Sequence, residues 1–81
     1  MKLPRDWSGR DVAAGLSRLG YQSTRETGSH LRLTTTRGGE HHLTIPDHPS
    51  LRVGTLASIL REVEEHHGLT REEVLRIVVD R

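Results

Sequence analysis

The 81 residues of this chain are enough for one small hydrophobic core and too few for two, so we expect a single domain over residues 1–81. The chain has no cysteine, which excludes disulfides and thiolate metal sites, and no apolar run approaches the ~18 residues of a membrane span or the length of a signal sequence's apolar region, so we expect a cytoplasmic protein. The net charge is +1, and eleven of the twelve basic residues are arginine, whose planar fork suits phosphate; charge alone permits a nucleic-acid partner but does not require one.

A first helix is predicted to start at Ser8. Ser8 and Asp11 have the spacing of a capping box, in which each side chain satisfies a backbone N–H of the first turn. Apolar residues then recur at helical spacing until Gly20, a residue type that commonly ends helices: Val12, Ala13, Leu16 and Leu19.

Three strands are predicted next. Residues 21–27 have the polar and β-branched composition of an edge strand. Leu31 and Leu33 alternate with polar residues in a second strand, and a hairpin loop at residues 37–39 leads into a third strand over residues 40–45. We expect these strands to form an antiparallel meander with one apolar face.

His30 stands where the Gly28–Ser29 turn becomes the second strand. Side chains alternate along a strand, so if Leu31 and Leu33 face the core, His30 faces the other side of the sheet. His30 is therefore not predicted to be a core histidine. It is either a solvated strand residue or a functional one.

Two helices are predicted after the sheet. Thr55 is a good N-cap for the first of them, and Gly68 is placed to end it, with one apolar face between: Leu56, Ile59, Leu60 and Val63. Thr70 and Glu73 form a second capping box, which opens a short terminal helix with an inward face made of Val74, Leu75 and Val78. The predicted fold class is α+β, in the order α-β-β-β-α with a short extra C-terminal helix.

Several short motifs follow one another over residues 8 to about 75. They read Leu-Gly-Tyr at 19–21, Arg25 followed by Gly-Ser-His at 28–30, Ile-Pro at 45–46 with His48, and Gly-Thr-Leu at 54–56 with Ile-Leu-Arg at 59–61. Together they resemble the HicA family of bacterial toxins. Two positions depart from that family's pattern: Leu33 stands where an aromatic residue is usual, and Ala57 where a basic residue is common.

The resemblance implies a function and a partner. HicA proteins are small RNA-cleaving toxins (mRNA interferases) with a double-stranded-RNA-binding-like fold, and each is neutralised by a HicB antitoxin encoded beside it. By this resemblance the catalytic histidine is His30, and a HicB-like protein is expected to cover the His30 face. Gly28, Ser29 and Arg61 belong to the matching motifs and are assigned to RNA binding with them.

The chemistry of RNA makes a single histidine a plausible catalyst. The 2′-hydroxyl is a built-in nucleophile, so cleavage needs a base for its proton, an acid for the leaving oxygen and cations for the phosphate. Histidine, with an ordinary pKa near ~6.5, can exchange protons at cellular pH. We therefore predict a metal-independent endoribonuclease with no cofactor.

Phosphate-binding residues are harder to assign from the sequence. Arg32 is expected on the His30 face, and Arg25 on the neighbouring strand, so both could bind phosphate; both could equally be solvated sheet arginines. Thr55 is at a predicted helix N-terminus, where free N–H groups can bind an anion, although a plain helix start is the commoner role.

The other five histidines do not have the spacing of a metal site. His41–His42 and His66–His67 are adjacent pairs, whose side chains diverge in a strand or a helix, and no carboxylate accompanies them at a metal-motif spacing. We predict that no metal binds, and that His66 and His67 lie at a helix C-terminus.

Two alternative functions stay open. The chain could be a non-catalytic double-stranded-RNA-binding module, or a protein-interaction domain. Trp7 and Tyr21 are the only residues of the Phe, Tyr and Trp class, and neither is in the second or third strand, so we expect recognition of RNA backbone and shape rather than base stacking.

Overall fold

The structure is a computed structural model that describes Leu3 and residues 5–79; for residues 25–27 it describes the backbone alone. Its elements follow in the order α1 (Gly9–Leu16), the 3-10 helix η1 (Ser17–Leu19), β1 (Gln22–Thr27), β2 (His30–Thr35), β3 (His41–Pro46), α2 (Val53–His67) and α3 (Arg71–Val78). This is the predicted α-β-β-β-α order with an extra C-terminal helix, so the predicted α+β fold class is confirmed. In the part of the chain that the structure describes, no helix has the length and apolar character needed to cross a membrane.

Both predicted capping boxes are present. The Ser8 hydroxyl accepts a hydrogen bond from the Asp11 backbone N–H, and the Asp11 carboxylate accepts one from the Ser8 N–H. Thr70 and Glu73 make the same reciprocal pair at the start of α3. Such boxes satisfy donors that a helix N-terminus otherwise leaves unpaired, which fixes where α1 and α3 begin.

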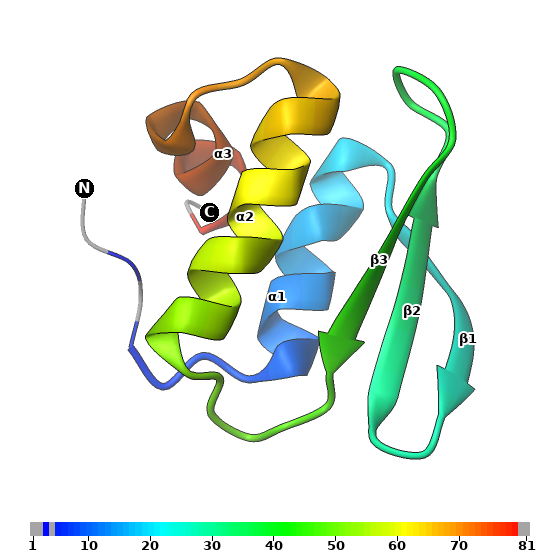
Figure 1. Ribbon diagram of the computed structural model, residues 1–81, viewed down its shortest axis with the longest axis vertical. Coiled ribbons are helices and arrows are strands. Elements are labelled where there is room, and N and C mark those ends of the chain that lie inside the picture. The colour runs from blue at the N-terminus through cyan, green and yellow to red at the C-terminus, as the bar shows by residue number, and fades with distance from the viewer. Residues whose placement is uncertain (1–2, 4, 80–81) are drawn as a thin grey trace.

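The sheet is an antiparallel meander in the order β1-β2-β3, and the helices pack on one side of it (Figure 1). Strand β2 alternates between exposed and buried side chains, with Leu31 and Leu33 buried. They join β3 and helix residues in one apolar cluster: Val12, Leu16, Leu19, Tyr21, Leu31, Leu33, Leu43, Ile45, Leu51, Leu56, Ile59, Leu60, Val63, Val74, Leu75 and Val78. The opposite face of the sheet is left uncovered by these helices.

Strand β1 contains a register shift that the alternation in the sequence did not predict. Ser23 pairs with Leu33, but Arg25 pairs with Arg32, so Thr24 is an extra residue in the ladder. A bulge of this kind shifts the pairing of all later β1 residues by one position along β2. It puts the backbone of Arg25 opposite Arg32, whereas strict alternation would have paired it with a core-facing position.

The predicted N-cap of α2 is wrong. The helix begins at Val53, and Arg52 occupies the cap in an extended conformation without a side-chain cap. The chain is anchored one residue earlier, where Leu51 is buried and its N–H donates to the Trp7 carbonyl at 2.7 Å. Because tertiary contacts fix this start, no side-chain cap is needed, and Thr55 becomes the third helical residue.

Candidate functional site

His30 is the first residue of β2 and faces away from the helices. The turn before it depends on Gly28, whose φ of +57° is a conformation that favours glycine. His30 is exposed, as predicted, and its backbone pairs with Pro46 across the sheet. Its imidazole has no hydrogen-bond partner among the residues that the structure describes, so both ring nitrogens are available to a ligand.

The loop after β3 is fixed against the His30 end of the sheet. The Asp47 N–H donates to the Ser29 carbonyl at 2.7 Å, which joins this loop to the β1–β2 turn. The Asp47 carboxylate also pairs with Arg10 at 2.9 Å. His30 therefore projects from a part of the backbone that is connected to both the neighbouring turn and α1.

Arg32 lies two residues beyond His30 on the same exposed face of β2. Its guanidinium makes no ion pair or hydrogen bond to any described residue, so it can bind an anion. Arg25, also predicted to bind RNA, pairs with Arg32 through its backbone, but its side chain lies outside the described residues. The geometry thus brings together the Gly28–Ser29 turn, His30 and Arg32.

The two predicted RNA-binding residues on α2 are not on that face. Thr55 is half-buried in the first turn of α2, at the end of the molecule where the β1–β2 turn also lies (Figure 1). Arg61 is exposed six residues further along, or about 9 Å of helix. Both belong to the helical layer, which packs against the face of the sheet opposite His30 (Figure 1).

A comparison with known protein families gives a match over residues 9–64, to the family described as the HicA toxin of bacterial toxin-antitoxin systems. The chain belongs to the HicA toxin family. The matched region runs from α1 through most of α2 and ends before α3. The chain matches none of the curated proteins and none of the solved structures with which it was compared.

The two departures from the HicA pattern have different structural settings. Leu33 is 1% exposed and packs in the core beneath the sheet, so it cannot contact a ligand on the His30 face. Ala57 is half-buried on α2, and its carbonyl accepts a hydrogen bond of 3.4 Å from Arg71 of α3. The last helix thus contacts one of the two positions at which the chain departs from the motif pattern described above.

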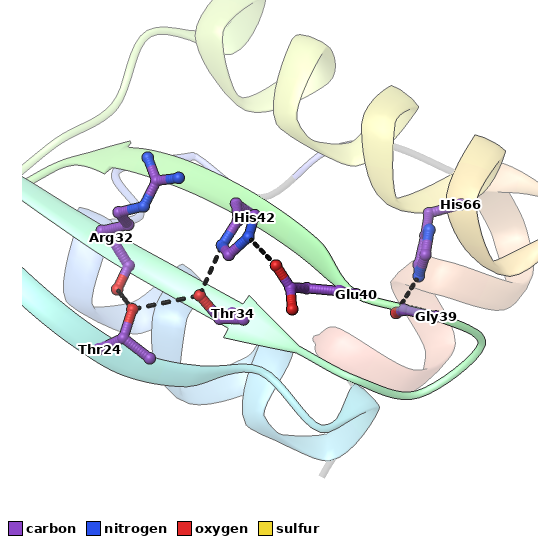
Figure 2. Close-up of polar contacts among 7 residues, drawn as sticks. All are labelled: Thr24, Arg32, Thr34, Gly39, Glu40, His42 and His66. Carbon is purple, nitrogen blue, oxygen red and sulfur yellow. Dashed lines mark hydrogen bonds and ion pairs between the residues drawn. The ribbon is translucent and has the colours of Figure 1, made fainter.

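A hydrogen-bonded network on the sheet's open face was not predicted from the HicA motifs or from spacing. The His42 ring lies between the Glu40 carboxylate, 2.8 Å from Nε2, and the Thr34 hydroxyl, 2.8 Å from Nδ1 (Figure 2). Thr34 also contacts the Thr24 hydroxyl at 3.2 Å, and Thr24 donates to the Arg32 carbonyl at 3.3 Å. The bulge at Thr24 allows this last link, since it reorients β1 beside β2.

A cluster of three histidines surrounds Tyr21 near the β2–β3 hairpin. The Tyr21 hydroxyl lies 2.7 Å from His41 Nδ1 and 3.1 Å from His67 Nε2. The His66 ring stacks on His41 with centroids 4.3 Å apart. Its Nε2 donates to the carbonyls of Arg37 and Gly39 at 3.1 Å each, and Figure 2 shows the bond to Gly39. His66 and His67 form the last turn of α2, as predicted.

These contacts define the protonation behaviour of the cluster. Burial, followed by repulsion from His66, lowers the pKa of both His41 and His67. Burial, together with the nearby Glu62 carboxylate, raises the pKa of Tyr21 to about 12. Among the described residues, no three histidine or carboxylate side chains are arranged to hold a metal ion. The cluster ties the β2–β3 hairpin to α2.

Proposed function

We propose that this chain is a toxin ribonuclease that cleaves mRNA by acid-base catalysis at His30 and is held inactive by a HicB-like antitoxin. One observation carries the proposal: in a member of the HicA family, an exposed histidine and an arginine, neither paired with any side chain that the structure describes, lie on the open face of a sheet. Gly28 and Ser29 form the turn that positions this histidine, and they are proposed to contact the RNA backbone there.

The reaction needs no water and no metal in its first step. His30 takes the proton of the 2′-hydroxyl, the 2′-oxygen attacks the adjacent phosphorus, and the bond to the 5′-oxygen breaks with its electron pair. The departing oxygen receives a proton, for which the newly formed imidazolium is a suitable donor. The products are a 2′,3′-cyclic phosphate and a free 5′-hydroxyl. Arg32 binds the phosphate and stabilises the charge that develops on it.

The antitoxin is proposed to cover the His30 face. An enzyme with one catalytic histidine is inhibited as soon as RNA is kept from that face, and the helices leave it open in the isolated chain. A structure of the complex should bury the His30 side chain. A complex in which His30 stays as exposed as in the free chain would contradict this part of the proposal.

The decisive experiment mixes purified chain with end-labelled RNA and analyses both the products and the protein–RNA complex. Cleavage with 2′,3′-cyclic phosphate ends, abolished by His30→Ala, supports the ribonuclease. Retardation of intact duplex RNA without cleavage would identify a double-stranded-RNA-binding module instead. Absence of both activities would favour a protein-interaction domain.

A further inference from the structure

The open face of the sheet carries a line of side chains that extends well beyond His30. Arg32 and Thr34 follow His30 on the same face of β2, and Thr34 pairs with His42 of β3. From His30 to the level of Thr34 and His42 is four residues, or about 13 Å of strand. That length matches roughly two nucleotides of an extended RNA strand, with Arg32 halfway along.

The charges on this face suit a polyanion. Strands β2 and β3 contain no acidic residue, and the Arg32 guanidinium makes no ion pair or hydrogen bond to any residue whose side chain the structure describes. Two acids flank β3, and both are paired: the Glu40 carboxylate with His42 and the Asp47 carboxylate with Arg10. An RNA strand lying along β2 and β3 therefore meets the Arg32 cation and no acidic side chain from these two strands.

The His42 ring is fixed in orientation and still accessible. Its Nε2 must carry a hydrogen to donate to the Glu40 carboxylate, and its Nδ1 is held by Thr34 (Figure 2). With both nitrogens occupied, the ring can offer a ligand only its flat face and edges. The side chain is 39% exposed, so part of that surface is accessible to a ligand.

We propose that the His42 ring stacks on a nucleobase about two nucleotides from the cleaved bond, while Arg32 binds an intervening phosphate. This subsite rests on the proposed function, because it takes the cleaved phosphate to lie at His30. Histidine stacks on bases as other aromatic rings do, and a ring fixed in advance loses little freedom when a base binds. Single-stranded RNA is the ligand, since a base within a duplex is not free to stack on a side chain.

The test measures binding rather than cleavage. The probe is a short single-stranded RNA with 2′-O-methyl groups, which cannot be cut, and an abasic residue introduced at each position in turn. On the wild-type chain one abasic position should weaken binding by about 5-fold to 160-fold, the range that corresponds to the loss of one base–aromatic stack. In His42→Ala the penalty at that position should disappear, and in His42→Phe, which keeps a flat ring, it should remain.

Controls separate this subsite from general effects. Ser58→Ala, at an exposed position on α2, should keep the full abasic penalty, and melting temperatures should show that each variant is folded. An abasic penalty of equal size in His42→Ala and the wild-type chain would overturn the proposal. So would a His42→Ala variant that binds RNA normally but loses affinity for a protein partner, since the face would then serve that partner.

Failure of the proposed function gives a different result. Suppose that the wild-type chain leaves unmodified RNA intact, and that the abasic penalty seen with it is absent in His42→Ala. Stacking is then supported and the ribonuclease is contradicted. If the chain cleaves RNA and the penalty does not depend on His42, the ribonuclease stands and the stacking subsite does not.

Discussion

The backbone N–H of Gly9 donates to the carbonyl of His48 at 2.9 Å, and this bond joins the start of α1 to the loop after β3. The approach is so close that a Cβ atom on Gly9 would stand 2.0 Å from the Pro46 carbonyl oxygen. Pro46 is the cross-strand partner of His30. A glycine on α1 thus helps set the backbone on which the candidate catalytic histidine stands.

Gly9→Ala should therefore destabilise the protein. Either α1 or the end of β3 must move to admit the methyl group, and such overpacking typically costs about 1–3 kcal/mol. Chemical denaturation of the two proteins measures the loss. Because the displaced backbone pairs with His30, RNA cleavage should also fall at temperatures where the variant is still folded.

Gly54→Ala is the matched control for stability. Gly54 is also in the first turn of a helix, but a Cβ there would meet no atom within 4 Å. Removing glycine's freedom in the unfolded chain should stabilise the protein by about 0.4–1 kcal/mol. Equal effects of the two substitutions would contradict the account of Gly9.

The free energy of unfolding should decrease as the pH falls below about 6.5, the ordinary pKa of histidine. His41 and His67 have lowered pKa values in the folded protein, so the unfolded chain binds protons first. The two rings contribute fully to the free energy of unfolding when the pH is above the histidine pKa of the unfolded chain. This contribution is lost as the pH falls through that value, and the loss levels off below the lowered pKa values of the folded protein. The charged groups that act on the two rings are His66, His42, Glu62 and Arg37.

Denaturation between pH 5 and pH 8 tests this dependence. Replacing His41 and His67 with Asn, which does not titrate, should flatten the profile, although the hydrogen bonds to Tyr21 are weakened at every pH. A wild-type protein that becomes more stable as the pH falls from 8 to 5 would contradict the assignment.

Tyr21 should titrate near pH 12 rather than near 10. It is the only tyrosine in the chain, so the absorbance of phenolate reports on it alone. Its raised pKa means that the unfolded chain loses the proton first, and stability should fall as the pH rises above about 10. A spectroscopic midpoint near 10 in the folded protein would show that the phenol is less shielded than its burial implies.

RNA cleavage should survive a chelator. The proposed first step uses the 2′-hydroxyl of the substrate as nucleophile, so no metal-bound water is required. Cleavage rates measured with and without EDTA should agree within error. A loss of activity in EDTA that added zinc restores would overturn the metal-independent mechanism.

Local patterns predicted most of the fold. The capping boxes at Ser8 and Thr70 depend on residues three apart, and the outward direction of His30 depends on alternation within one strand. These features need no knowledge of the rest of the chain. The predicted start of α2 was wrong because the true start depends on the hydrogen bond between Leu51 and Trp7, which are 44 residues apart in the sequence.

The two polar networks could not be predicted for the same reason. His67 meets Tyr21 across 46 residues, and His42 is oriented by Thr34 of a neighbouring strand and by Glu40. The paired histidines were considered as metal ligands, and their spacing argued against that role. The prediction against base stacking likewise counted only Phe, Tyr and Trp. It left out histidine, whose ring can also stack on a base, and His42 is oriented by hydrogen bonds at both ring nitrogens.

The most direct test of the central claim compares His30→Ala with the wild-type chain in RNA cleavage rate, melting temperature and RNA affinity. The account predicts a fall in rate of at least about 100-fold, the low end for a general acid or base. Stability should change by no more than about 0.5 kcal/mol, because the exposed ring contributes nothing to the core. Affinity should stay salt-dependent and largely intact, since it comes from cations such as Arg32. A folded His30→Ala variant that cleaves RNA at the wild-type rate would contradict the account.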